Sequence, residues 1–452
     1  MSASLARSLG LTTATALVVG EVVGVGIFLT PATMAMSLGS PMLVLLGWIA
    51  MGVMAACGAL CYGELASRIP EAGGGYAYLR EAYGPLIAFL YGWKSLLVMD
   101  PGLTAALALG LASYVAAIAP MSPWAQKVVA LVAIVLVAAT NIRGARLAGS
   151  VLRSATLLKL ALLAALAIWA FGARLGDWGH FIPLAERRSG SPPLVGALAG
   201  GFVAAFFSFG GWWDVAKIGG EVRDPSRNLP RALLLGVFVV TLIYILTSAA
   251  FLYLVPIDAV RSGEAFAAQA GEVLFGASGG RILSLIVVIC VLSSLAALMM
   301  AAPRVYWAMA RDGVFPHAVA KVHPRFGTPA RAISLQAALA ALLVLVGSFS
   351  QVVAYFIFVT VAFVGLTVGS LFIFRRRDLA AAVQVSRAEP AFRTPGFPVP
   401  AIIFLSLVML LLLLLAVEAP LQAALGTGVM ALGWPAYRIV MRQPQGAREG
   451  MS

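Results

Sequence analysis

Charged residues are scarce in this chain. Aspartate, glutamate, lysine and arginine together make up 11% of its 452 residues, and hydrophobic residues make up 61%. The mean hydropathy is +0.97. A soluble domain with this composition could not keep its apolar surface away from water. The composition therefore excludes a soluble protein and predicts an all-α protein that crosses a lipid bilayer many times.

Cysteine is almost absent. The three cysteines, Cys57, Cys61 and Cys290, all lie within apolar runs. No loop outside the cytoplasm carries a thiol that could join another chain. We therefore expect no disulfide-linked heavy subunit.

Histidine is equally rare, and no metal-binding motif or paired-carboxylate spacing occurs. The three histidines, His180, His317 and His323, fall in loops on opposite sides of the membrane. We expect no metal, no cofactor and no enzymatic activity, with a membrane enzyme acting on lipids kept as an alternative class. The net charge is +13, but the sequence has no soluble domain in which the basic residues cluster. We therefore do not expect nucleic acid as a partner.

Long apolar runs dominate what is present. About twelve segments are long enough to cross the hydrocarbon core. They lie at 11–36, 41–66, 84–118, 124–141, 151–172, 195–220, 231–255, 281–302, 331–348, 351–374, 398–418 and 421–441. With a cytoplasmic N-terminus, the even-numbered connections and the two tails hold 22 of the 31 basic residues. This asymmetry predicts that both termini are cytoplasmic. We expect a multi-pass protein of the plasma (inner) membrane.

The stretch "VVGEVVGVGIFLTPATM", residues 18–34, interrupts the first apolar segment with glycines and a proline. A broken helix frees backbone N–H and C=O groups in the middle of the membrane. Gly24 and Gly26 let a ligand approach the main chain, and a half-helix starting near Ile27 would point its N–H groups at an anion such as a carboxylate. The alternative is that these glycines only permit close helix packing.

Segment six carries a second interruption, with Gly210 and Gly211 in mid-span. The two interrupted segments are five apart, which is typical of a transporter built from two inverted repeats. We expect a cytoplasmic tail at 1–10, repeats at 11–174 and 195–376, two additional helices at 398–441 and a cytoplasmic tail at 442–452.

Four motifs occur in order along the chain. They are G-V-G-I-F in segment one, "YGELASRIPEAGGGYAYLREAYGPLIAFLYGW" after segment two, "EVRDPSRNLPRA" after segment six and "RVYWAMARDGVFPHAVAKVHPRFGTPARAI" after segment eight. With these motifs the chain resembles the amino acid/polyamine/organocation (APC) transporters from about residue 10 to residue 440, and within them the bacterial L-type amino acid transporter branch. The resemblance implies a LeuT-like 5+5 inverted repeat with broken helices 1 and 6, and alternating access.

The resemblance also implies a substrate site. The substrate carboxylate would meet backbone N–H groups of Val25, Gly26 and Ile27, although related transporters often carry a serine or threonine at the position of Val25. The α-amino group would meet the carbonyls of Phe207, Ser208 and Gly210. Phe207 matches an aromatic that closes over the substrate from outside, with a purely structural place in the core as the alternative.

Lys159 lies about eight residues into segment five, deep enough that an unpaired ammonium needs an internal partner. It matches a lysine of related transporters whose ammonium replaces a sodium ion beside broken helix 1. This match implies transport that needs no sodium. The alternative is a side chain that snorkels to the cytoplasmic surface.

Glu21, Asp100, Asp214 and Lys217 also lie within the apolar segments. The spacing of Asp214, Lys217 and Glu221 allows them to neutralise one another on one helix, with a cytoplasmic gate as the functional alternative. Asp100 has no partner obvious from the sequence. Three alternatives stay open for Asp100: it pairs with Lys94, it holds a cationic substrate group or it takes a proton.

The sequence therefore predicts a sodium-independent transporter that binds the zwitterionic backbone of an L-amino acid. Exchange, proton symport and uniport stay open, as does a preference for cationic amino acids or polyamines. A channel is the other alternative class, and it is disfavoured because the breaks form an enclosed site instead of a ring along a pore.

Overall fold

A computed structural model describes residues 5–24, 26–260, 263–346, 357–381, 391–418 and 420–442. These residues form helices joined by loops, and the described part has no β-sheet beyond two isolated bridges. Nine described helices are long and apolar enough to cross a membrane, or ten when the bent pair α1 and α2 is taken as one span. The expected all-α membrane protein is confirmed.

A helix stands at each of the twelve expected segments. The first six spans are α1 (Leu11–Val22) with α2 (Gly26–Leu38), α3 (Pro41–Arg68), α5 (Pro85–Lys94) with α6 (Asp100–Ile118), α7 (Pro123–Ile142), α8 (Ala145–Gly172), and α9 (Leu194–Phe209) with η3 (Trp212–Lys217). The other six are α10 (Pro225–Leu254), α12 (Gly279–Ala301) with α13 (Pro303–Arg311), α14 (Ala330–Val346), α16 (Ile357–Ala381), α17 (Val399–Glu418) and α18 (Pro420–Arg442). The α14 helix, with 17 residues, and α18 fall outside the count of nine.

The structure adds elements that the hydropathy pattern did not separate. A short helix, α4 (Gly75–Tyr83), precedes span three, and α11 (Gly263–Phe275) precedes span eight. A π-helical turn, η1 (Ser95–Met99), joins α5 to α6. Gly84, with φ of 89°, allows the sharp turn from α4 into α5.

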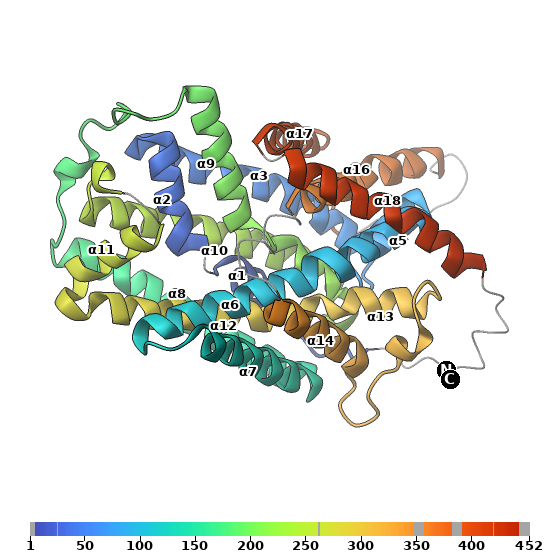
Figure 1. The fold of residues 1–452 in the computed structure, drawn as a ribbon. Helices are drawn as coiled ribbons and strands as arrows, with labels where there is room; N and C mark the ends of the chain where they lie inside the picture. Colours follow the sequence, from blue (N-terminus) through green and yellow to red (C-terminus); the bar gives the residue numbers. More distant parts are fainter. Residues whose placement is uncertain are drawn as a thin grey trace.

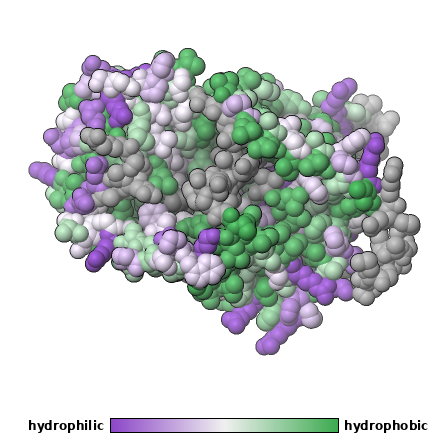
Figure 2. Space-filling view, viewed as in Figure 1, coloured by the Kyte–Doolittle hydropathy of each residue, from purple (hydrophilic) through white to green (hydrophobic). Residues whose placement is uncertain are grey.

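The surface and the long axis agree with a membrane protein. Helix α11 lies at one end of the molecule, and α13 lies at the other, with the long helices running between them (Figure 1). Figure 2 shows hydrophilic residues gathered toward the ends and hydrophobic residues over much of the area between them. Large apolar side chains such as Val135, Ile168, Phe238 and Met409 are exposed, as expected where lipid is the solvent.

The helices around the breaks pack in a recurring pattern. Helix α2 packs against α9, α3 against α10, α6 against α12, and α7 against α14. In each pair, the second helix stands five spans after the first. The breaks in spans one and six therefore lie side by side, because the half-helices α2 and α9 form one of these pairs.

Candidate functional site

The first break separates α1 from α2, whose axes differ by 46°. The break follows Val22, and Val25 within it lies outside the described residues, so its expected contact with a carboxylate stays a prediction. Gly26 opens α2, and its neighbour Ile27 is fully buried. The first N–H groups of a helix have no acceptor within the helix. The start of α2 thus offers donors to an anion, as expected from the sequence.

The second break separates α9 from the six-residue 3-10 helix η3. Gly210 has extended backbone angles, and Gly211 has a φ of 107°, which a residue with a side chain rarely adopts. The chain therefore leaves the α-helical path directly after Phe209. This frees the last carbonyl groups of α9.

The two breaks touch each other. A Cβ atom on Gly26 would lie 2.5 Å from the hydroxyl of Ser208 and 3.2 Å from its Cα atom. The hydroxyls of Ser208 and Thr30 lie 2.5 Å apart and share a hydrogen bond. Only a residue without a side chain fits at position 26, so the glycine brings the start of α2 directly onto the end of α9.

A cavity of about 70 Å³ lies beside this contact. It is several times larger than the roughly 10–15 Å³ that one water molecule needs. Its lining combines both breaks with apolar side chains: Glu21, Val22, Gly24, Gly26, Met99, Leu103, Leu107, Phe206, Phe207, Ser208, Gly210, Gly211, Trp213 and Thr360. Four residues expected to bind substrate, Gly26, Phe207, Ser208 and Gly210, are among them. Ile27 is not.

Two of the three carbonyls expected to hold an amino group, those of Phe207 and Ser208, already have partners. The amide of Gly210 donates a hydrogen bond to the carbonyl of Phe207, at 3.2 Å. The hydroxyl of Tyr244 lies 2.8 Å from the carbonyl of Ser208. Because a carbonyl oxygen has two lone pairs, each can still accept one more hydrogen bond.

Lys159, on α8, has no exposed surface. Its ammonium donates hydrogen bonds to the carbonyls of Gly20, at 2.7 Å, and Val23, at 2.5 Å. These are free carbonyls at the C-terminal end of α1, where the helix dipole is negative. The side chain therefore does not snorkel to the surface. It lies against the unwound part of span one, where the resemblance places it.

Three hydroxyl groups complete this region and were missed in the sequence. Tyr244 on α10 lies 2.8 Å from the carbonyl of Val22, as well as from that of Ser208. Ser294 on α12 donates to the carbonyl of Gly20 at 2.7 Å. Thr30 bonds Ser208, as described above. A tyrosine or serine in an apolar helix carries no signal of a distant partner.

Buried charged side chains from span three and η3 form one cluster near the cavity. The ammonium of Lys217 lies 2.7 Å from Asp214 and 3.3 Å from Asp100. The hydroxyl of Tyr306 donates to the other oxygen of Asp100, at 2.9 Å. Lys94 does not pair with Asp100. Its ammonium lies 3.0 Å from the sulfur of Met99.

Glu221 does not belong to this cluster, contrary to the neutralisation allowed by its spacing. It forms a buried, two-contact ion pair with Arg304 of α13, at 2.6 and 3.1 Å. The 3-10 geometry of η3 and η4 (Gly219–Glu221) replaces the α-helix on which that spacing depends. The carboxylate therefore points away from Lys217.

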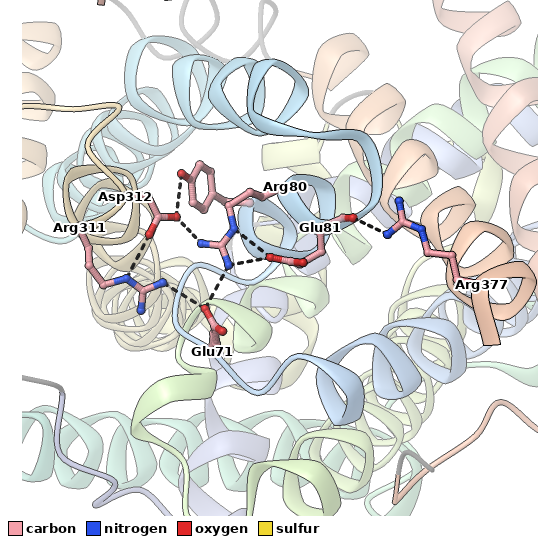
Figure 3. Close-up of polar contacts among 7 residues, drawn as sticks. Glu71, Arg80, Glu81, Arg311, Asp312 and Arg377 are labelled. Carbon is pink, nitrogen blue, oxygen red and sulfur yellow. Dashed lines mark hydrogen bonds and ion pairs between the residues drawn. The ribbon is translucent and has the colours of Figure 1, made fainter. Parts of the chain in front are cut away.

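The end of the bundle that carries α4 and α13 is closed by ionic contacts (Figure 3). Arg80 on α4 contacts Asp312, Glu71 and Glu81. Arg311 lies 3.1 Å from Glu71 and 3.2 Å from Asp312. Burial opposes the charge of Arg80, but the hydrogen bond and charge of Asp312 outweigh it and raise the pKa of this arginine. Arg80 therefore keeps its charge at neutral pH.

Backbone contacts close the same end beneath η3. Leu9 forms a bridge with Val222, and Ala72 forms one with Ile218. The amide of Gly73 donates to the carbonyl of Lys217, at 2.9 Å. The segment before α1 and the loop between α3 and α4 therefore both pack against η3 and the residues that follow it. Among the described residues, no three His, Cys, Asp or Glu side chains form a metal site.

Comparison with known proteins agrees with this geometry. The family model described as amino acid permease matches residues 9–437. The chain is 32% identical to the serine/threonine exchanger SteT of Bacillus subtilis (strain 168), over 88% of this chain and 89% of that protein. It is 31% identical to the human b(0,+)-type amino acid transporter 1, over 86% and 81% of the two chains. It is 29% identical to the mouse large neutral amino acids transporter small subunit 2, over 96% and 81%. The expected resemblance is confirmed, and the chain belongs to the amino acid permease family of the APC superfamily.

Proposed function

We propose that this permease transports neutral L-amino acids without sodium, by alternating access around the cavity between the two breaks. The observation that carries the proposal is the direct contact of Gly26 with Ser208, which sets the donors of α2 beside the acceptors of α9. A zwitterionic amino acid needs both. Its carboxylate would accept from the N–H groups of Gly26 and Ile27, with Val25 completing the site, and its amino group would donate to carbonyls of Phe207, Ser208 and Gly210.

The cavity walls favour a neutral side chain. Met99, Leu103 and Leu107 from span three face Phe206 and Trp213 from span six. An ammonium or guanidinium placed among these apolar side chains would lose its hydration, with the Glu21 carboxyl as the one acidic group of the described lining. The names of two relatives point the same way, since one is a serine/threonine exchanger and another a large neutral amino acids transporter. This geometry disfavours cationic amino acids and polyamines as main substrates.

Sodium independence rests on Lys159. Its fixed ammonium already binds the carbonyls that a cation from solution would need. Among the described residues, no carboxylate lies within ion-pair distance of this ammonium, so the carbonyls of α1 are its counter-charge. A second cation in the same place would be repelled.

We propose that two inverted repeats, 11–174 and 195–376, move relative to each other to change the access to the site. Each helix pair around the site joins one span of the first repeat to its counterpart in the second. Rocking one repeat against the other would open the α4 end only after the contacts of Arg80 and Arg311 break. We propose that this end faces the cytoplasm, with both termini, in the plasma (inner) membrane.

The transporter is proposed to act without a disulfide-linked heavy subunit. Cys61 and Cys290 are buried within helices, and Cys57 lies within α3. None of them stands in a loop that a partner chain could reach.

The test is uptake into proteoliposomes that contain the purified protein. Radiolabelled L-serine, L-leucine and L-arginine would be offered, with and without unlabelled neutral amino acids inside the vesicles. We expect saturable uptake of L-serine or L-leucine that exceeds that of L-arginine, with stimulation from inside for an exchanger. Flux that does not saturate would indicate a channel, and a preference for L-arginine would refute the neutral substrate class.

A further inference from the structure

Glu21 is a buried acid that has no role in the transport cycle proposed above. It lies on the last turn of α1, directly before the first break, and is 8% exposed. A Cβ atom on Gly211 would lie 2.8 Å from its Cγ atom, so the side chain rests against the second break. Glu21 therefore spans the narrow space between the two broken helices.

The Glu21 carboxyl has acceptors around it and lacks donors. Within the described part of the chain, neither of its oxygens receives a hydrogen bond, and neither does Oδ1 of Asp214. Both carboxyl groups belong to residues at the turn that starts η3: Glu21 packs against Gly211, and the amide of Asp214 donates to the carbonyl of Gly211 at 2.9 Å. Buried carboxylate oxygens without a donor are costly inside a protein, and one proton on these two carboxyl groups lowers that cost.

The charges of the buried side chains around Glu21 also favour one bound proton. Three carboxyl groups, Glu21, Asp214 and Asp100, are buried together with two ammonium groups, Lys217 and Lys94. If all five were ionised, the cluster would carry one net negative charge in a region of low dielectric. Two adjacent carboxylates in such a place cannot both ionise without a large penalty. A single proton makes the cluster neutral.

Within the described residues, the other elements packed against α1 supply no substitute cation. From α10 comes the hydroxyl of Tyr244, which faces the carbonyl of Val22. From α8 comes Lys159, whose ammonium is held by the carbonyls of Gly20 and Val23. From α12 comes the thiol of Cys290, which is buried beside Lys159.

We propose that Glu21 and Asp214 form a proton-binding site that joins the two broken helices while the α4 end is closed. The shared proton stabilises the contact between α1 and η3. Because opening of the α4 end would move α1 away from η3, the two carboxyls would separate and the proton would be released to water. This coupling to transport rests on the proposed function, whereas the proton site itself does not.

The proton can be detected directly. Infrared difference spectra of the purified protein in lipid, recorded between acidic and alkaline pH, separate protonated from ionised carboxyl groups. We expect the wild type to retain one protonated buried carboxyl per chain at neutral pH. Glu21→Gln should remove it, and its amide can still donate to Asp214, so the contact and the fold should survive. Asp214→Asn should also remove it, because the new amide donates to an ionised Glu21.

The matched control is Asp258→Asn, at an exposed acid of the loop before α11, which should leave the signal unchanged. A wild type without a protonated carboxyl at neutral pH overturns the proposal, and this result needs no variant. Persistence of the signal in both Glu21→Gln and Asp214→Asn overturns it as well. L-arginine binding that is lost in Glu21→Gln would assign the carboxyl to a substrate cation instead, and would also overturn it.

Uptake of L-serine by proteoliposomes tests the coupling. We expect its pH dependence to be flatter in Glu21→Gln than in the wild type, and an equally steep profile in both would overturn the coupling. A protonated carboxyl that disappears in the variants, in a protein that transports no amino acid, would support the proton site and refute the proposed function.

Discussion

The hydroxyl oxygen of Tyr244 lies 2.8 Å from the carbonyl oxygen of Val22, at the end of α1. It lies equally close to the carbonyl of Ser208, near the end of α9. One side chain of α10 thus links the ends of both half-helices that flank the cavity. Since a hydroxyl has one proton, it can donate to either carbonyl but not to both at once.

We expect Tyr244→Phe to weaken the substrate site without unfolding the protein. The ring still packs against Trp48 and Phe209, and only the hydrogen bond is lost. A hydrogen bond of this kind contributes about 0.5–1.5 kcal/mol, so the apparent affinity for L-serine or L-leucine should fall roughly two- to tenfold. The control is Tyr253→Phe, on the same helix α10 as Tyr244. The ring of Tyr253 packs against Phe171 and Trp178. Equal effects of the two variants would contradict the bridging role.

Gly26→Leu should abolish substrate binding. A side chain at this position collides with Ser208, at 2.5 Å for the first carbon atom alone, and so separates the two breaks. The measurement is binding of radiolabelled L-leucine or L-serine to purified protein, with gel filtration to check the fold. Gly196→Leu is the matched control, because a Cβ atom at Gly196 on α9 meets no atom within 4 Å. Normal binding in Gly26→Leu would show that the substrate lies elsewhere.

The breaks and the twelve spans could be read from the sequence because hydropathy and glycine placement are local signals. The residues that line the cavity could not be predicted from the sequence. Met99 and Leu103 come from span three and Thr360 from span ten, and only the folded bundle brings them to the breaks. The same holds for Ser294, whose partner Gly20 is 274 residues away.

The prediction for Glu221 was wrong for a physical reason. Its spacing from Lys217 indicates a pair only on a continuous α-helix, and the chain there forms 3-10 turns after the break at Gly211. The carboxylate then meets Arg304 instead. Asp214 and Lys217, within η3 itself, remain paired as expected.

Glu221→Gln should destabilise the protein strongly. Arg304 is fully buried, and the loss of its carboxylate partner leaves an uncompensated charge, at a cost of about 3–5 kcal/mol. We expect a clear fall in the midpoint of thermal unfolding, measured by fluorescence-detected gel filtration after heating. Glu186→Gln, at an exposed site, should have little effect. Unchanged stability in Glu221→Gln would mean that the ion pair is not formed in the membrane.

Both termini are predicted to be cytoplasmic, because lysine and arginine gather in the tails and even-numbered connections. A reporter that is active only in the cytoplasm, fused after residue 452, should be active in a bacterial host. A second fusion within the loop between Asp177 and Ser191, which joins α8 to α9, should be inactive. Activity only from a periplasmic reporter at the C-terminus would reverse the topology.

The last prediction concerns Lys159, whose ammonium is buried against the carbonyls of Gly20 and Val23. A fixed charge in this place supplies what a bound sodium ion would supply, so replacing sodium by choline should leave wild-type uptake of L-serine or L-leucine unchanged. Lys159→Ala removes charged hydrogen bonds that contribute about 1.5–3 kcal/mol each. Uptake should therefore fall roughly tenfold or more.

Leu160→Ala is the matched control for this variant, since it shortens a neighbouring, half-buried side chain on the same helix and leaves the ammonium in place. It should retain most of the uptake. Two results would contradict the role of Lys159: strict sodium dependence in the wild type, or uptake in Lys159→Ala equal to that in Leu160→Ala. If sodium restored uptake to Lys159→Ala, the interpretation would be strengthened, because the ion would then occupy the place that the ammonium had left.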